Sequence, residues 1–578
     1  MRGFSQKTFL SCTILCMFVV NISCHVWEHA DQIFVQPKAI FTFKIAFAPQ
    51  NLDVLNSTFW QISNPKSPLF GKHLTDEQIA DLISLPQTEI AKVDEFLKRD
   101  SEQICEVKTK LNLHRDYLRV RTCVGQAESI FPNLKLGFYQ RMGTTKRILR
   151  SVNLVDAGEN LHFLGVPKSL HSLMAGVHDI TDVPMMLTRS NSESEKFNPF
   201  QWFPKTDKEL SLPEIADYFQ IPKAPLAESL LNTDNPQVRN SVVEFGDAAF
   251  SKQDLEDLQK YYGLPLDPVT KIVGTEEDKV VINEVDLDVE TITAIAKGAQ
   301  TWDFVFDDST SLVDVIETVM KTPGSPKTVS CSWGGPESDA GKSIVFAANT
   351  ALLKLGLAGF TWINDAGDAG PTLNPADCNS FDPRFPAVSP YVLGVGGVKI
   401  TKATGVEGAW FRSSGGFSNY FDRPAFQNEA VENYLSKAPL PPNPNGSRFS
   451  TTGRAFPDVA AFAAYFPIFY QGKLQPIGGG TSTATPQWAG LITLVNALRY
   501  QKGLGPLGPL APTLYKLEKG VGFDVVEGQT YALSRIGCKD QYLPGFYAYE
   551  GWDPTTGLGS PRYDLLLEQL LEIGSPNQ

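Results

Sequence analysis

The chain has 578 residues, longer than one compact domain usually is, and its 42% hydrophobic and 11% aromatic residues can fill a large core. This composition excludes an intrinsically disordered chain. The formal net charge is −13, and no basic cluster supports nucleic-acid binding. An acidic chain suits work at low pH, where protonated carboxyl groups repel one another less.

Residues 1–24 are typical of a signal peptide. Arg2 and Lys7 precede an apolar run at 9–20, and small or polar residues follow it. A membrane anchor is the alternative, but the run is shorter than the roughly 20 residues of a spanning helix. No later stretch of the sequence is long and apolar enough to span. We therefore expect a soluble protein of the secretory pathway, destined for a lysosome or for the outside.

Residues 25–195 alternate strand and helix patterns, which predicts an α/β plait. Strands are expected at 41–47 and 115–124, and helices at 51–62, 76–83 and 89–99. Residues 190–208 are polar and contain proline, which is typical of an exposed linker that proteases can cut.

Residues 196–578 predict a different domain, because short apolar strands alternate with helices. This order favours a mostly parallel, doubly wound α/β sheet. Strands are expected at 241–245, 302–306, 329–333, 359–364 and 391–396, and helices at 251–262, 284–298, 310–321, 340–355 and 483–500.

Five of the eight cysteines follow the signal segment, at positions 105, 123, 331, 378 and 538. Cys105 with Cys123, and Cys378 with Cys538, are candidate pairs in an oxidising compartment. Cys331 lies in a strand pattern and is expected to be a buried free thiol. No Cys-x-x-Cys pair supports a zinc site. The sequons at Asn56 and Asn445 are compatible with secretion.

Ser482 lies in Gly480-Thr-Ser-Thr-Ala-Thr-Pro486, a Gly-Thr-Ser turn at the start of an apolar helix, with Pro486 expected in its first turn. This pattern is typical of a serine-hydrolase nucleophile. All seven histidines lie at or before position 178, so the usual histidine base is absent from the rest of the chain. If Ser482 is a nucleophile, a carboxylate must take its proton. The alternative is that Ser482 only caps the helix.

Glu284 and Asp288 are four residues apart and share one face of the expected helix, for which Asn283 is a candidate N-cap. Two adjacent carboxylates can share a proton, which raises the pKa of one of them. Such a pair can act as base and orienting group for Ser482. The alternative is a solvated acidic helix face.

Asp368 follows the expected strand 359–364, at the end of the sheet where open α/β sheets bind ligands. A protonated Asp368 can donate to an oxyanion, whereas the alternative is an ordinary glycine-rich turn. Two C-terminal loops carry Asp524 and Asp553. Two carboxylates with backbone carbonyls can form a calcium shell, and the alternative is two ordinary turns.

Together these motifs resemble those of the sedolisins, the serine-carboxyl peptidases. Gly-Thr-Ser-x-x-x-Pro at 480–486 is similar to the family's nucleophile motif, and Glu-x-x-x-Asp-Val at 284–289 to its Glu/Asp pair. Ala-Gly-Asp-Ala-Gly at 366–370 resembles its oxyanion motif, with Ala366 where Ser is usual. Further similar blocks lie at 384–392, 414–424 and 453–461, a prodomain-like block at 67–75, and a block like the start of the mature enzyme at 212–222.

The resemblance implies Ser482 as nucleophile, Glu284 as general base, Asp288 as its partner and Asp368 in the oxyanion site. It also implies one structural Ca²⁺. The implied calcium ligands are the side chains of Asp524 and Asp553 and the carbonyls of Val525, Tyr549 and Gly551. Tyr-Glu-Gly-Trp-Asp at 549–553 departs from the family's usual Gly-Pro-Gly-Trp-Asp or Ala-x-x-Gly-Tyr-Asp, but a carbonyl ligand tolerates a change of side chain.

The resemblance further implies a subtilisin-like catalytic domain at 196–578, an activation prodomain at 25–195 and a signal peptide at 1–24. We expect an acid-acting, monomeric, self-processing zymogen that releases tripeptides from free N-termini of polypeptides and is inhibited by its own prodomain. The alternatives are an endopeptidase of the same family and an inactive peptide-binding relative. An ordinary subtilisin-type protease is excluded because residues 196–578 contain no histidine.

Overall fold

The computed structural model describes residues 27–574 apart from 31–32, 100–103, 142–146, 153–160, 163, 180–187, 190–206, 228–229, 231–233, 247, 275–279, 340, 375 and 533–542. The expected signal peptide and most of the expected linker lie outside the described residues. Among the described residues, no helix has the length and apolar character needed to cross a bilayer.

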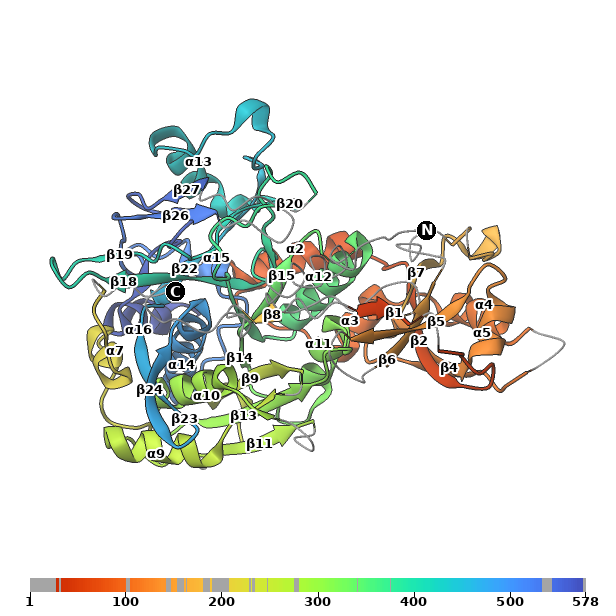
Figure 1. Cartoon of the computed structure of the whole chain (residues 1–578), viewed down its shortest axis with the longest axis horizontal. Coiled ribbons are helices and arrows are strands. Elements are labelled where there is room, and N and C mark those ends of the chain that lie inside the picture. The colour runs from red at the N-terminus through yellow and green to blue at the C-terminus, as the bar shows by residue number, and fades with distance from the viewer. Residues whose placement is uncertain are drawn as a thin grey trace, which may run out of the picture.

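The C-terminal part of the chain is built on one large sheet (Figure 1). Its strands are β9 (Arg239–Phe245), β11 (Val269–Val273), β13 (Gln300–Phe306), β14 (Thr328–Cys331), β16 (Thr361–Asp365), β18 (Leu393–Ile400), β19 (Glu407–Ala409) and β22 (Val459–Phe462). Their order is β11-β13-β9-β14-β16-β18-β19, and β22 also pairs with β18. Only the β18–β19 pairing is antiparallel in this sheet. The predicted mostly parallel, doubly wound fold is confirmed.

Helices cover both faces of this sheet. On one face lie α10 (Asn283–Ile295) and α14 (Thr481–Gln501), and on the other lie α11 (Leu312–Lys321) and α12 (Lys342–Leu357). The neighbouring residues Val242 and Val243 of β9 enter the two different cores, because successive side chains of a strand point to opposite faces. Because both faces of these strands are buried, their sequences are continuous apolar runs and do not alternate with polar residues.

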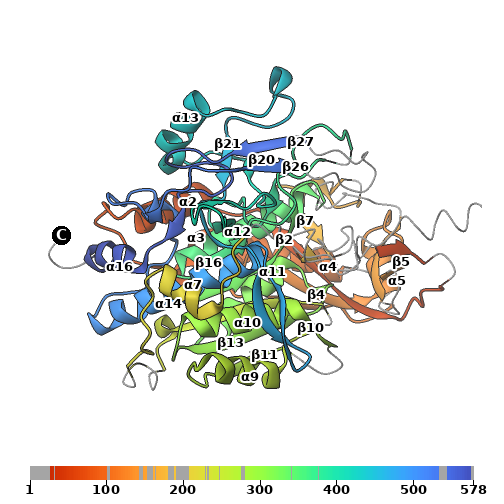
Figure 2. The same ribbon diagram turned by 60° about the vertical axis from the view of Figure 1, so that its left-hand side comes forward.

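Helix α14 is buried on all sides from residue 481 to 497, as expected of a helix enclosed within the core. It begins two residues earlier than predicted, so Pro486 lies in its second turn. A hairpin of β23 (Phe466–Tyr470) and β24 (Lys473–Gly478) runs alongside α10 and leads into the start of α14 (Figure 2).

The predicted N-cap role of Asn283 is wrong. Ile282 is the N-cap residue of α10, and Asn283 is already helical. The short strand β12 (Val280–Val281) pairs with β10 (Ala248–Ala249) and brings the chain extended up to Ile282. The Asp286 carboxylate accepts a hydrogen bond from the backbone N–H of Ser251 at 2.6 Å.

The N-terminal part contains a four-stranded antiparallel sheet of order β3-β4-β2-β7. Its strands are β2 (Ile40–Phe47), β3 (Lys108–Leu111), β4 (Tyr117–Cys123) and β7 (Met174–His178), and helices α4 (Gln87–Lys98) and α5 (Val124–Ile130) share its core. A three-stranded sheet of β1 (Trp27–His29), β5 (Leu136–Arg141) and β6 (Arg147–Ser151) lies beside it. The Cys105–Cys123 disulfide is present, and Cys331 is a buried free thiol, as predicted. Cys378 is also disulfide-bonded, and Cys538 lies outside the described residues.

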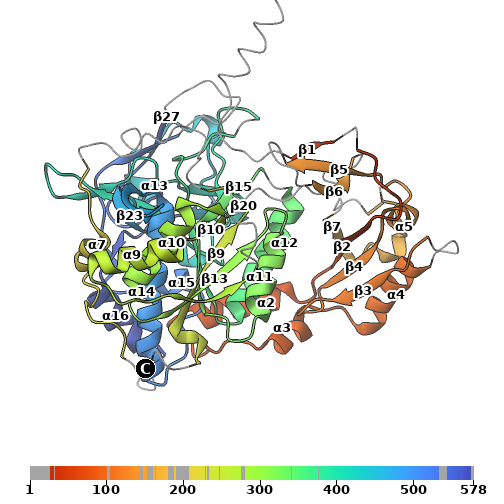
Figure 3. The ribbon, with the colours of Figure 1, turned by 60° about the horizontal axis from the view of Figure 1, so that its bottom comes forward.

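Two N-terminal helices, α2 (Leu52–Ser63) and α3 (Asp76–Ile83), pack on α12 of the C-terminal part (Figure 3). Leu55, Phe59 and Ile62 of α2 form a core with Leu353 and Leu357 of α12. Close approach requires glycine at 356, where a Cβ atom would come within 2.5 Å of the Phe59 ring. The N-terminal and C-terminal parts therefore share a well-packed apolar interface.

Candidate active site

Ser482 lies in the first turn of α14, directly after a glycine turn. Gly480 is the N-cap residue, with φ of +93°, and a Cβ atom there would come within 2.5 Å of Asp368 Oδ2. The turn therefore needs glycine both for its backbone conformation and for space. Ser482 is buried, and its Oγ has no hydrogen-bond partner among the described residues. Since Gly480 occupies the cap position, helix capping does not account for Ser482.

Asp368 lies beside this turn. Its Oδ1 accepts hydrogen bonds from the Thr481 backbone N–H at 2.8 Å and the Thr481 hydroxyl at 2.7 Å, while its buried Oδ2 has no partner within the described chain. Burial raises the pKa of Asp368 to about 6; the Thr481 bonds and Arg412 lower it, and Asp365 adds to the rise. In mildly acidic solution Asp368 is therefore a protonated acid next to the Ser482 backbone.

Glu284 and Asp288 of α10 are 1% and 0% exposed, so a solvated acidic face does not describe them. Burial raises the pKa of Asp288 well above its usual range, and the charges of Glu244 and Glu284 act in the same direction. The neighbouring Ser332 hydroxyl offsets this in part, although neither Asp288 oxygen has a hydrogen bond of ordinary geometry to the described residues. Ser332 donates instead to the Ser482 carbonyl at 3.2 Å.

The fold brings these four predicted residues to one end of the large sheet. Strands β9, β14 and β16 are parallel neighbours, and Glu244, Ser332 and Asp365 lie at or just beyond their carboxyl ends. Ligands of open α/β sheets bind at this end. The Ser482 hydroxyl has no hydrogen bond to Glu284 in this full-length chain, and such catalytic contacts commonly tighten only when substrate is bound.

Sequence reasoning missed Glu244 and Trp333. Glu244 is completely buried, and its Oε2 accepts a hydrogen bond from Trp333 Nε1 at 2.8 Å. Both residues lie in stretches whose pattern predicts strands, at 241–245 and 329–333. The available signal was the acidic residue within the apolar run Ser241-Val-Val-Glu-Phe, because a charged side chain is almost never fully buried without a specific partner.

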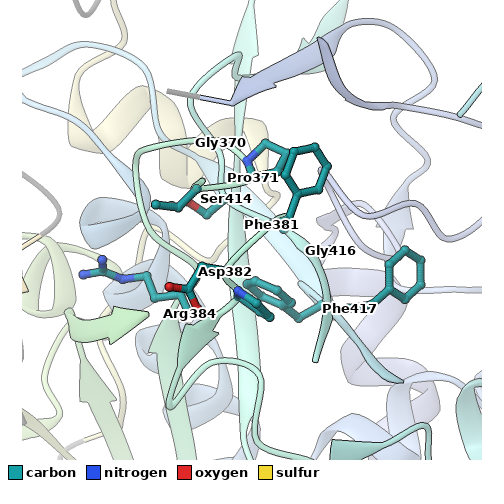
Figure 4. Close-up of a pocket in the computed structure, with 12 residues that line it drawn as sticks. Gly370, Pro371, Phe381, Asp382, Arg384, Ser414, Gly416 and Phe417 are labelled. Carbon is teal, nitrogen blue, oxygen red and sulfur yellow. The ribbon is translucent and has the colours of Figure 1, made fainter. Parts of the chain in front are cut away.

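A pocket opens beside the Asp368 turn (Figure 4). Its lining residues are Gly370, Pro371, Thr372, Phe381, Asp382, Pro383, Arg384, Ser414, Gly415, Gly416, Phe417 and Phe456. Ser414 joins it to the turn, since Ser414 Oγ accepts from the Ala369 N–H at 3.2 Å and the Ser414 N–H donates to the Gly367 carbonyl at 2.8 Å. Its wall is largely apolar, with a few polar groups from Thr372, Asp382, Arg384 and Ser414.

The two predicted calcium loops lie together. Asp524 accepts a hydrogen bond from the Gly551 N–H at 2.9 Å, and Asp553 accepts one from the Tyr549 N–H at 3.2 Å. Burial raises the pKa of Asp553 to about 7 and raises that of Asp524 as well. Carboxylates are hard oxygen ligands of the kind that Ca²⁺ prefers, and in that respect these residues fit the ion. Asp553 also accepts hydrogen bonds from Thr555 and Thr556. In the described part of the chain, no group of three or more His, Cys, Asp or Glu side chains is placed to hold a metal. The predicted calcium site has only two such side chains, those of Asp524 and Asp553.

Comparison with known proteins agrees with this geometry. The Pro-kumamolisin activation domain family matches residues 28–182. Tripeptidyl-peptidase 1 of Dictyostelium discoideum is 27% identical over 96% of this chain and 92% of its own length. The rat and human enzymes of that name are each 28% identical over 93% of this chain and 92% of theirs.

These matches show that the chain is similar to the sedolisins. A Pseudomonas sedolisin, described as a serine-carboxyl proteinase, has the same fold, with a TM-score of 0.50 at 23% identity over 64% of this chain and all of its own. With an activation domain and these relatives, the protein is a serine-type peptidase made as a zymogen. The sedolisin catalytic set is Ser, Glu and Asp, which are the side-chain types gathered around the start of α14.

Proposed function

We propose that this protein removes tripeptides from the free N-termini of polypeptides at acidic pH. The observation that carries the proposal is the convergence of Ser482, Asp368 and the α10 carboxylates at the carboxyl end of the sheet. The tripeptidyl specificity is supported by relatives named tripeptidyl-peptidase 1 that align over almost their whole length.

In the proposed reaction Ser482 Oγ attacks the carbonyl carbon of the scissile peptide bond while Glu284 takes its proton. Asp288 positions Glu284, and the two carboxyl groups share a proton in the buried site. Asp368 donates its proton as a hydrogen bond to the developing oxyanion. The C–N bond then breaks, and the leaving amine takes the proton from Glu284. Water, activated by the same Glu284, hydrolyses the acyl-enzyme and restores Ser482.

We propose that residues 25–195 form the activation prodomain and 196–578 the peptidase. The short strand β8 (Thr188–Arg189) supports this, because its backbone pairs antiparallel with β15 (Trp333–Pro336). Trp333 holds Glu244 at the site, so a segment at the expected junction runs along the edge of the site. A chain in this position would block a peptide that docks there, which is how a prodomain inhibits.

We propose that one Ca²⁺ binds at Asp524 and Asp553, with the carbonyls of Val525, Tyr549 and Gly551 as further ligands. Bound there, the ion would neutralise the buried carboxylate of Asp553 and the exposed carboxylate of Asp524, and would fix the C-terminal loops. Its contribution is to stability, and no chemical step passes through it. Delivery through the secretory pathway to a lysosome or to the outside is part of the same proposal, as are polypeptide substrates and a monomeric state.

The test of specificity uses one long peptide in two forms, with a free and with an acetylated N-terminus. Processed enzyme is incubated with each at acidic pH, and the products are identified by mass spectrometry. Successive tripeptides from the free form and almost none from the acetylated form are expected. Equal cleavage of both forms at internal bonds would favour the endopeptidase, and no cleavage of either form, with folded and processed protein, would favour the inactive peptide-binding relative.

A further inference from the structure

His73 lies at the interface between the N-terminal and C-terminal parts, in the segment that joins α2 to α3. Its ring is enclosed by two glycines of the C-terminal part: a Cβ atom on Gly359 would lie 2.6 Å from His73 Nδ1, and one on Gly508 would collide with Nε2. The following residue, Leu74, donates its backbone N–H to the Leu357 carbonyl at 2.8 Å. The imidazole therefore fills a slot that only glycine leaves open.

The slot does not accommodate a charged imidazole. The residue keeps a little solvent contact, but Nε2 is buried and has no hydrogen-bond partner among the described residues. The two ionised groups that face it are both cations, Lys327 before β14 and Arg499 of α14. Burial and these two charges all act to lower the pKa of His73, to about 4.

Neither cation is neutralised by a carboxylate partner in the described residues. Lys327 Nζ donates to the Ala358 carbonyl at 3.0 Å and lies 3.7 Å from the Phe360 ring centre. Arg499 donates to the carbonyls of Gly505, Leu570 and Ile573. Asp76 is the acidic group that acts on Lys327 at longer range, and it also lies 3.3 Å from His114.

We propose that His73 is an acid-sensitive latch: its neutral ring holds the N-terminal part on the C-terminal part, and its protonation favours release of that part. The proposal rests on the zymogen function given above and adds the residue that senses pH. Seven histidines lie at or before position 178 and none after it, so any histidine switch of this chain is in the segment to be released.

The direction and size of the effect follow from proton linkage. The pKa of a released His73 lies near the ordinary value of 6.5, whereas burial and the two facing cations lower the pKa of the docked ring to about 4. Docking is therefore unaffected above pH 6.5 and is weakened as the pH falls from 6.5 towards 4, because protons bind the released form preferentially. Between pH 7 and pH 4.5 these two values weaken docking by roughly 60-fold.

His114 differs from His73 in that carboxylates lie beside it. Burial and the charge of Lys354 lower the pKa of His114, and the carboxylates of Asp76 and Asp116 offset this in part. Lys354 holds the pKa of Asp116 below its usual range. This ion pair therefore persists in mild acid. Protonation of His73 weakens docking under the same conditions, because the two charged groups that face its ring are both cations.

The test measures opening without catalysis, in the full-length chain carrying Ser482→Ala. Hydrogen exchange of the Leu74 amide, corrected for its intrinsic pH dependence, reports release of the segment. The wild-type interface is expected to open roughly 60-fold more at pH 4.5 than at pH 7. His73→Gln should reduce this change to a few-fold, and Lys327→Gln should reduce it in part because one facing cation is lost.

His171→Gln is the matched control. His171 lies in the same N-terminal part but hydrogen-bonds the Val166 carbonyl at 2.8 Å, so this variant should open as the wild type does. If His73→Gln and Lys327→Gln both open as steeply with acid as the wild type, the proposal is wrong. Because the readout needs no peptide cleavage, a chain without peptidase activity would refute the proposed function and leave this result standing.

Discussion

The pH dependence of Asp368 gives the most quantitative prediction for the reaction. Its pKa is raised to about 6, chiefly by burial, and in the proposed mechanism only the protonated acid donates to the oxyanion. Activity is therefore full below this pKa and lost above it. Between pH 5 and pH 7 the protonated fraction, and with it kcat/KM, falls roughly tenfold if Asp368 alone titrates.

Asp368→Asn separates this ionisation from the donor itself. The amide oxygen can replace Oδ1, which accepts from Thr481, and the amide nitrogen can replace Oδ2 as a donor that does not ionise. The variant should keep much of its activity at pH 5 and lose the decline near pH 6. Asp368→Ala removes the donor and should lose about 100- to 1,000-fold, as other oxyanion donors do.

The assay is kcat/KM of processed enzyme for one peptide substrate from pH 4 to pH 7.5, with folding checked at each pH by circular dichroism. Asp377→Asn, at an exposed loop carboxylate, serves as the control and should keep the wild-type profile. A decline near pH 6 that persists unchanged in a folded, active Asp368→Asn variant would refute the assignment of this ionisation to Asp368.

Three further predictions concern other parts of the molecule. Ser482→Ala, Glu284→Gln and Asp288→Asn should each lower kcat/KM by orders of magnitude with the melting temperature preserved, because the three groups act as one unit; a variant with wild-type kinetics would remove its residue from the set. Excess chelator or Asp553→Ala should lower the melting temperature, since Ca²⁺ at 100 times its Kd stabilises by about 2.7 kcal/mol; an unchanged melting temperature in chelator would argue against the ion. Acidification should convert the full-length chain to a form cut within residues 185–208, seen as a mobility shift on a gel; full activity of an uncut chain would contradict this.

Much of the fold was predictable because its strands and helices carry strong local patterns. The expected strands 241–245 and 302–306 correspond to β9 and β13, and the expected helix 76–83 is α3 to the residue. The cap of α10 was not predictable, because pairing of β12 decides where that helix starts. The packing of α2 against α12 also depends on contacts between parts of the chain far apart in sequence, which no local pattern records.

The nucleophile and carboxylate positions could be proposed from motifs, but their environment could not. From the sequence, Glu284 and Asp288 are equally compatible with a solvated acidic helix face. Only their burial in the structure excludes that interpretation. Glu244 was hidden in an apolar strand run, and its contact with Trp333 joins residues 89 positions apart. His73 likewise looks ordinary in the sequence, and it acquires a role only because Gly359, Gly508 and two cations enclose it.

The central claim is that a carboxylate, and not a histidine, activates Ser482. Its most direct test is labelling of processed enzyme with an alkyl fluorophosphonate at acidic pH, followed by mass spectrometry of the digested protein. We expect one adduct, on Ser482, formed rapidly in the wild type and slowed by orders of magnitude in Glu284→Gln. An adduct at another residue, or Ser482 labelling at the wild-type rate in Glu284→Gln, would contradict the account.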